Sequence, residues 1–149
     1  MANTYTQIVY HVVFSTKGRD PAILPARRDD LYAYLWGVHK KLHCHLYRIG
    51  GVEDHVHLLF SLPPTLALAS YIEKIKTAST NWIRREKVYS RWPGWQDGYG
   101  AFTVSWSDRD EVIEYIKSQP EHHKQITWLE EYRQMLEKAG VAYDERYLA

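Results

Sequence analysis

The sequence predicts an α+β fold of the ferredoxin-like type, a β-α-β-β-α-β antiparallel sheet with additional C-terminal helices. Three observations lead to this prediction. Apolar runs of the length of a strand occur at four places. Segments with apolar residues at helical spacing lie between the first and second runs and between the third and fourth. Further helical patterns follow the fourth run. For this order we expect the two helices between strands to cover one face of the sheet.

The first half of the chain supplies one strand, one helix and a hairpin. The run YTQIVYHVVFS, rich in β-branched and aromatic residues, predicts a strand over Tyr5–Ser15. Apolar residues at helical spacing predict a helix over Asp29–Leu42. Two short apolar runs, His45–Val52 and His55–Leu62, predict a hairpin, and the pair Gly50-Gly51 permits a bend or bulge.

The second half supplies a long helix, a strand and two further helices. Thr65 follows two prolines and can cap a helix that runs to about Val88. After a loop rich in Trp, Gly and Pro, residues 99–106 alternate like a fourth strand. Ser107-Asp108 is expected to cap a third helix interrupted by Pro120, and a last amphipathic helix is expected over 127–139.

The composition is that of an ordinary globular chain, with 149 residues, 45% of them hydrophobic and 25% charged. We expect a single domain over residues 1–149. No apolar run approaches the roughly 20 residues that span a bilayer, and residues 1–10 lack a basic start followed by an apolar core, so we expect no membrane partner and no secretory signal. The single cysteine, Cys44, fits a reducing compartment, which predicts a cytoplasmic protein.

The net charge of +1 hides an uneven distribution: residues 1–106 carry 13 Lys and Arg against 8 Asp and Glu, and residues 107–149 carry 6 against 10. Basic residues gather near aromatic ones in the region 74–95. This set predicts either phosphate contacts beside rings that stack on bases or a solvated helix face over core aromatics. Its members are Lys74, Lys76, Arg84, Arg85, Lys87 and Arg91, close to Trp82, Tyr89, Trp92 and Trp95.

Two histidines on the third predicted strand, His55 and His57, stand two residues apart, so the strand's period of two sends both side chains to one face. Imidazoles at this spacing suit a divalent cation, with Glu53-Asp54 able to add ligands or to orient a histidine. Hydrogen-bonded structural histidines are the alternative. His11 has no comparable spacing, and we expect a structural or surface role for it.

Tyr115 and Gln119 lie four residues apart on the third predicted helix, where the helical repeat stacks them on one face. A phenol can attack phosphorus, and a glutamine carbonyl oxygen can bind Mg²⁺ or Mn²⁺. A core tyrosine beside an exposed glutamine is the alternative. His122 and His123 also have two interpretations: they approach the site as proton carriers or phosphate contacts, or they are polar residues at a helix start. Four other tyrosines lack a ligand-type residue four positions later on a helix: Tyr99, Tyr132, Tyr143 and Tyr147.

Together these features resemble the single-tyrosine HUH transposases of the smallest bacterial insertion sequences, which form the IS200-like family. The term HUH describes a strand with the pattern His-hydrophobic-His. The stretches GGVEDHVHLLFSLPP, GYGAFTVSWS and VIEYIKSQPEHH carry the resemblance in this order. It implies one HUH-type domain in which His55, His57 and Gln119 bind Mg²⁺ or Mn²⁺. It also implies that Tyr115 cleaves and rejoins single-stranded DNA through a 5′-phosphotyrosine. The family's substrates bear DNA hairpins, and its members are typically homodimers in which the tyrosine helix of one subunit often completes the site of the other.

Two alternatives belong to other functional classes. One is a non-catalytic, domesticated domain that binds hairpin DNA or RNA. The other is a metal hydrolase that uses water and in which Tyr115 is structural. Replacement of Tyr115 separates these readings, because only a tyrosine nucleophile leaves a covalent adduct on DNA.

Overall fold

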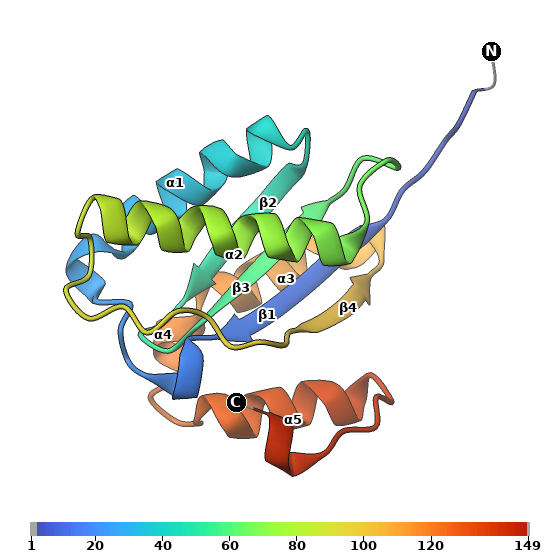
Figure 1. Ribbon diagram of the computed structural model, residues 1–149. Helices are drawn as coiled ribbons and strands as arrows, with labels where there is room; N and C mark the ends of the chain where they lie inside the picture. Colours follow the sequence, from blue (N-terminus) through green and yellow to red (C-terminus); the bar gives the residue numbers. More distant parts are fainter. Residues whose placement is uncertain (1–2, 149) are drawn as a thin grey trace.

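Four antiparallel strands form one sheet in the order β2-β3-β1-β4, which is the order expected of a ferredoxin-like fold (Figure 1). The computed structural model describes residues 3–148; Met1, Ala2 and Ala149, which the predicted domain includes, lie outside the described residues. The strands are β1 Val9–Ser15, β2 His45–Gly51, β3 His55–Ser61 and β4 Gly100–Val104.

Helices cover both faces of this sheet (Figure 1). The two helices between strands pack on one face, as predicted, where Tyr34 of α1 and Trp82 of α2 stack with ring centroids 4.6 Å apart. The helices after β4 cover the other face. The α-helices are α1 Arg28–Lys41, α2 Leu68–Arg85, α3 Arg109–Lys117, α4 Gln119–His122 and α5 Trp128–Lys138, and short 3₁₀ turns lie at Lys17–Arg19, Pro25–Arg27, Trp106–Asp108 and Glu145–Tyr147.

The strand β3 separates two different environments. Because side chains alternate along a strand, Val56, Leu58 and Phe60 point into the apolar core beneath α1 and α2. His55 and His57 point to the opposite face, towards α3, α4 and α5, and both are fully buried. The strand therefore gives one face to packing and the other to a cluster of polar side chains.

Two glycines allow the C-terminal helices to approach the sheet closely. A Cβ at Gly50 of β2 would lie 2.8 Å from the backbone oxygen of Ile116 on α3, and a Cβ at Gly100 of β4 would lie 2.7 Å from the ring of Tyr132 on α5. These distances are shorter than ordinary van der Waals contacts. The absence of a side chain at both positions sets how near α3 and α5 come to the two histidines.

Several predicted boundaries were wrong. The strand β1 begins at Val9 rather than Tyr5, because Val9 pairs with Val104 at the end of β4 and Tyr10 pairs with Phe60 near the end of β3, so earlier residues have no strand beside them. The fourth strand is shorter than 99–106 for the same reason.

The predicted helix caps also differ from the structure. The second helix begins at Leu68 after Ala67, not after Thr65, and it ends at Arg85. The third predicted helix is divided into α3 and α4 at Ser118, just before Pro120. The capping box of α5, in which Thr127 and Glu130 exchange hydrogen bonds, fits the predicted start of the last helix.

Among residues 3–148, no helix combines the length and the apolar character needed to cross a membrane.

Candidate metal and nucleophile site

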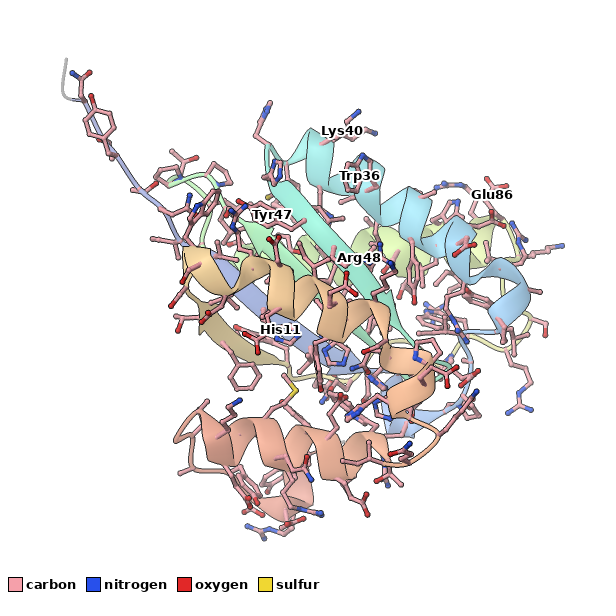
Figure 2. All side chains as sticks on the ribbon, turned by 180° about the vertical axis from the view of Figure 1, so that it is seen from behind. His11, Trp36, Lys40, Tyr47, Arg48 and Glu86 are labelled. Atoms are coloured by element: carbon pink, nitrogen blue, oxygen red, sulfur yellow. The ribbon has the colours of Figure 1, made fainter. Side chains whose placement is uncertain are left out.

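His55 and His57 are held by hydrogen bonds to one nitrogen of each ring. The Nδ1 atom of His55 lies 2.7 Å from a carboxylate oxygen of Asp54, and Nδ1 of His57 lies 2.9 Å from Nε2 of His11. Figure 2 shows His11 on the face of the sheet that looks towards α3 and α5. With both Nδ1 atoms engaged, the Nε2 atoms of the pair are directed into the space below α3 and α5.

Tyr115 and Gln119 come from the elements directly above this pair. The Tyr115 ring lies 5.7 Å from the His57 ring between centroids, and Oε1 of Gln119 lies 3.0 Å from Nε2 of His55. The two residues do not share one helix, because Gln119 is the first residue of α4. The four residues singled out in the sequence nevertheless meet within one chain.

Glu131 of α5 occupies the centre of this cluster. Its Oε1 lies 3.2 Å from Nε2 of His57 and 3.3 Å from Nε2 of His55. Its Oε2 accepts a hydrogen bond of 2.9 Å from the side-chain amide of Gln119 and another from the hydroxyl of Tyr115. The carboxylate therefore links the histidine pair to the tyrosine.

His122 and His123 also reach the cluster. Nε2 of His123 lies 2.9 Å from Oε1 of Glu131, and Nε2 of His122 lies 3.3 Å from Oε2 of the same carboxylate. The His122 side chain is 35% exposed and that of His123 only 8%. His122 is thus the member of the pair that is open to solvent and to a bound molecule.

An aromatic wall closes the inner side of the site. The buried Trp128 of α5 stacks on His55 with ring centroids 4.3 Å apart and an interplanar angle of 18°, and Tyr132 stacks on Trp128 at 4.8 Å. These rings exclude water from the histidine pair, which strengthens electrostatic interactions within the cluster.

Burial and the neighbouring carboxylates shift the pKa values of the two histidines in opposite directions. Burial lowers the pKa of His57 to about 4, so this imidazole is neutral at pH 7. Burial acts in the same direction on His55, but hydrogen bonds to Asp54 and Glu131 outweigh it and raise the pKa of His55 to about 9. Burial would also raise the pKa of Glu131, yet its hydrogen bonds to the histidines hold that pKa well below its ordinary value. Burial and the neighbouring Glu131 raise the pKa of the Tyr115 phenol.

The donor set fits a divalent cation. Donor atoms of His55, His57 and Glu131 all lie within 4.8 Å of one another, and a second group of His122, His123 and Glu131 meets the same condition. Histidines that ligate metals commonly donate their other N–H to a carboxylate or similar acceptor, as His55 does to Asp54. The residues present are therefore able to hold the ion that the sequence predicts.

A cavity of about 780 Å³ leads to the site between α3, α5 and β4. Tyr115, His122 and Glu131 line its inner part, and Phe102 and Met135 line its walls. A ligand that enters beside the edge strand β4 therefore meets the Tyr115 side chain.

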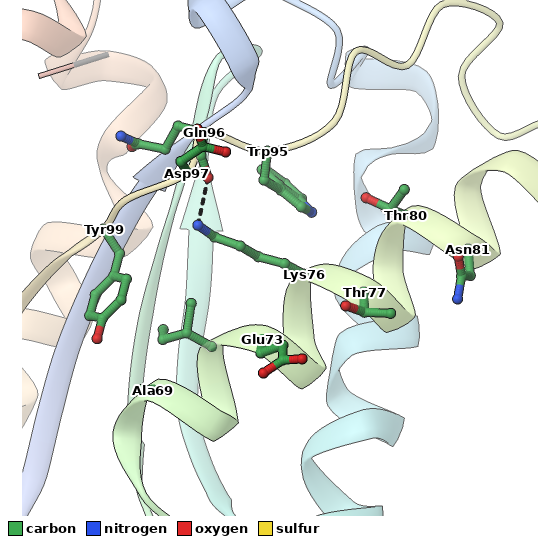
Figure 3. Close-up of a pocket in the computed structure, with 11 residues that line it drawn as sticks. Ala69, Glu73, Lys76, Thr77, Thr80, Asn81, Trp95, Gln96, Asp97 and Tyr99 are labelled. Atoms are coloured by element: carbon green, nitrogen blue, oxygen red, sulfur yellow. Dashed lines mark hydrogen bonds between the residues drawn. The ribbon is translucent and has the colours of Figure 1, made fainter. Parts of the chain in front are cut away.

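The basic and aromatic region 74–95 is divided between core and surface. Trp95 and Tyr89 are buried. Lys76 donates a hydrogen bond of 2.6 Å to the backbone oxygen of Gln96 (Figure 3) and another of 2.9 Å to that of Gly98. Burial lowers the pKa of Lys76 to about 8. These members serve the fold, whereas five cations are exposed: Lys74, Arg84, Arg85, Lys87 and Arg91. Of these, Arg85 lies in an ion pair with Glu86 and Arg91 in an ion pair with Asp20.

Sequence reasoning missed His11 and Glu131. The signal for Glu131 lies in the spacing of α5, where Trp128, Tyr132 and Leu136 form the buried stripe and Glu131 falls on the same side. A charged residue on the apolar face of a helix indicates a buried polar site. His11 stands two residues from both Val9 and Val13 and so shares their buried face.

Comparisons with known proteins agree with this fold. The sequence model of the family described as "Transposase IS200 like" matches residues 4–119. The chain is 28% identical over 121 residues to the ISDra2 transposase TnpA of Deinococcus radiodurans, covering 76% of this chain and 84% of that protein. It is 25% identical over 129 residues to the transposase of insertion sequence element IS200 from Salmonella typhimurium, covering 83% and 84%.

One solved structure shares the fold at low identity. It is the REP-associated tyrosine transposase bound to a REP hairpin, with a TM-score of 0.61, 15% identity, and coverage of 85% of this chain and 76% of that one.

Proposed function

This chain belongs to the IS200-like transposases, and from that premise we propose that it cleaves and rejoins single-stranded DNA through Tyr115 beside a divalent cation held by His55, His57 and Gln119. The observation that carries the proposal is the meeting of these four side chains beside a cavity that Tyr115 lines. They come from a strand, a helix and the start of another helix, so their convergence is a property of the fold.

The nucleophile would be the hydroxyl oxygen of Tyr115. A bond forms between this oxygen and the scissile phosphorus while the bond from phosphorus to the 3′ oxygen breaks. The phenol gives up its proton and the released 3′ oxygen gains one, so a 5′-phosphotyrosine and a 3′ hydroxyl result. Attack by a 3′ hydroxyl on the phosphotyrosine reverses these changes and rejoins a strand without an external source of energy.

The residues of the site supply what this step requires. A phenol has an ordinary pKa near 10, and the pKa of Tyr115 lies above it, so the proton must leave as the new bond forms. Mg²⁺ or Mn²⁺, when bound by His55, His57 and Gln119, would polarise the phosphoryl oxygen and neutralise developing charge. The stacked Trp128 shields His55 from water, which would strengthen the interaction of this imidazole with a bound ion.

Exposed cations provide a surface for the DNA backbone. Lys17, Arg19 and Arg91 line a second cavity of about 620 Å³, and the one carboxylate in its lining is Asp20. Phosphates are bound by such side chains in a manner that depends on salt. We propose that hairpin-bearing single-stranded DNA binds there and reaches Tyr115 with its unpaired segment.

A homodimer in the cytoplasm remains our expectation from the family resemblance. The cluster of His55, His57, Tyr115 and Gln119 forms within a single chain, so a second subunit is not needed to bring these four residues together. Light scattering on the purified protein measures the number of subunits directly.

Covalent capture tests the proposal. Wild-type protein incubated with hairpin-bearing single-stranded DNA and Mg²⁺ or Mn²⁺ is expected to give a protein–DNA adduct that survives denaturing electrophoresis. Tyr115→Phe removes the nucleophilic oxygen and is expected to abolish the adduct. Tyr147→Phe is the matched control, because Tyr147 is 74% exposed outside the cavity and its loss leaves the site intact.

The other outcomes identify the alternatives. An adduct that persists in Tyr115→Phe would refute the assignment of the nucleophile. Cleavage without any adduct, lost in His57→Ala but kept in Tyr115→Phe, would indicate a hydrolase that uses water. Binding of the DNA hairpin without cleavage, whether Mg²⁺ or Mn²⁺ is present, would indicate a binding domain.

A further inference from the structure

We propose that Glu131 is a direct, anionic ligand of the cation, so that α5 completes a centre of two histidines and one carboxylate. The inference rests on the proposed function, because it concerns the ion of the same site. It adds a residue that lies outside the matched residues 4–119 and that changes the charge of the donor set.

The distances between donor atoms support this assignment. Ligands about 2.0–2.1 Å from an octahedral cation lie roughly 3 Å from their nearest neighbours. The separation is 3.0 Å between His55 Nε2 and Gln119 Oε1, 3.2 Å between His57 Nε2 and Glu131 Oε1, and 3.3 Å between His55 Nε2 and Glu131 Oε1. The four atoms are spaced like ligands around one ion.

Charge gives an independent reason. Two imidazoles and a glutamine oxygen are neutral ligands, and a divalent ion held by them alone would be a double positive charge in a site where His55, His57 and Gln119 are all fully buried. A buried ion of that kind needs a countercharge. Glu131 is the carboxylate whose oxygen lies against both Nε2 atoms, and its side chain is only 2% exposed.

The geometry also assigns a different task to each oxygen of Glu131. Oε1 faces His55 and His57, while Oε2 accepts the hydrogen bond from the hydroxyl of Tyr115. The same carboxylate thus orients the tyrosine relative to the ion. Because α5 carries Glu131 and Trp128, the docking of α5 and the binding of the ion are coupled.

The donor types predict which metal binds more tightly. Mg²⁺ prefers oxygen ligands and keeps several waters, whereas two imidazoles and one carboxylate are typical of transition metals. We expect Mn²⁺ to bind more tightly than Mg²⁺ by at least about tenfold, because Mg²⁺ prefers oxygen ligands and gives up its waters reluctantly.

Calorimetric titration with Mn²⁺ tests the role of Glu131 without measuring activity. Glu131→Gln keeps the shape of the side chain but removes its charge, and we expect the affinity for Mn²⁺ to fall by at least about tenfold. Glu130→Gln is the matched control, since Glu130 is exposed and its role is to accept a hydrogen bond from the backbone of Thr127. The affinity of Glu130→Gln for Mn²⁺ is expected to stay within about twofold of the wild-type affinity.

A measurement on unaltered protein keeps the test decisive if Glu131→Gln does not fold. In crystals grown with Mn²⁺, the anomalous signal is expected within about 2.3 Å of an oxygen of Glu131. A signal bound by the histidines but well separated from this carboxylate would overturn the inference. An affinity of Glu131→Gln equal to wild type, or the absence of Mn²⁺ binding by wild type, would overturn it as well.

Failure of this inference and failure of the proposed function give different results. Wild-type protein that forms the Tyr115 adduct while Glu131→Gln binds Mn²⁺ normally would contradict the role of Glu131 alone. Wild-type protein that binds Mn²⁺ through Glu131 yet never forms an adduct with DNA would contradict the proposed function and leave the metal centre in place.

Discussion

His11 and His57 share a fully internal hydrogen bond of 2.9 Å between Nε2 of the first ring and Nδ1 of the second. The two rings lie 5.1 Å apart between centroids on neighbouring strands. Because the bond occupies Nδ1 of His57, it leaves Nε2 of the same ring as the atom that faces Glu131. His11 therefore orients the proposed ligand without touching the ion site itself.

We expect His11→Ala to weaken Mn²⁺ binding by about tenfold to a hundredfold, the usual effect of losing a partner that orients a metal-bound histidine. The physical reason is that the His57 ring becomes free to rotate or to change its tautomer. Calorimetric titration measures the change. His45→Ala is the control, since His45 is exposed on β2, and equal affinities of the two variants would contradict the orienting role.

Two pKa shifts of opposite sign predict how stability depends on pH. In the metal-free protein the pKa of His55 is about 9 and that of His57 about 4, against 6.5 for an unperturbed histidine. The raised pKa of His55 contributes stability that is fully present below pH 6.5 and is lost as the pH rises towards about 9. The lowered pKa of His57 makes the folded state lose stability as the pH falls from 6.5 towards about 4.

The Tm of metal-free protein is therefore expected to pass through a maximum near pH 6.5. Circular dichroism melting in the presence of a chelator measures it. Asp54→Asn removes a charged partner that raises the pKa of His55, so the loss of stability on the alkaline side should become smaller. A Tm that does not change between neutral pH and about pH 9 would rule out the raised pKa of His55.

The close approach of α3 to β2 predicts different effects at two glycines. Gly50→Ala places a Cβ against Ile116 and should lower the free energy of unfolding by about 1–3 kcal/mol and reduce adduct formation, because α3 carries Tyr115. Gly37→Ala is the control. Gly37 lies inside α1, and a Cβ there would meet no atom within 4 Å in the described part of the chain. The free energy of unfolding of Gly37→Ala should therefore rise by about 0.5–1 kcal/mol. Urea denaturation and the capture assay together measure both effects.

The basic residues are expected to separate into two groups. Lys76→Met removes two hydrogen bonds to backbone oxygens and should destabilise the fold by about 1–3 kcal/mol while leaving the salt dependence of DNA binding unchanged. Arg19→Ala and Arg91→Ala should each weaken DNA binding and reduce the slope of log affinity against log salt by about 1.

Fluorescence anisotropy at several salt concentrations distinguishes these groups. Lys40→Ala is the control, because Lys40 is exposed at the end of α1, outside the cavity lined by Lys17, Arg19 and Arg91 (Figure 2). A normal slope for Arg19→Ala together with a reduced slope for Lys40→Ala would place the DNA elsewhere on the surface.

The order of strands and helices was predictable because each element carries its own periodicity. The spacings of His55 and His57 and of Tyr115 and Gln119 left structural roles open, and the resemblance to the IS200-like family joined these residues in one predicted site. The sequence did not predict Glu131, since the pair Glu130-Glu131 in the first turn of a helix is equally explained by the helix dipole. The position of Glu131 on the same side of α5 as the buried Trp128 and Tyr132 distinguishes it from the exposed Glu130.

The strand boundaries were less predictable for a related reason. Residues 5–8 resemble the rest of β1 in composition, but a strand extends only as far as its neighbours do. The register between β1 and β4, which ends at Val9 and Val104, decides where pairing stops. That register depends on pairs of residues that are 87 to 95 positions apart in the sequence.

The alternation along β3 makes this strand a partition between two tasks. Val56, Leu58 and Phe60 pack in the apolar core on one side, and the buried His55 and His57 lie at the proposed metal site on the other. Substitutions at the interface between the sheet and the paired helices α1 and α2 thus offer an engineer a way to raise the thermal stability of the protein. The backbone of β3 separates these substitutions from the proposed metal site.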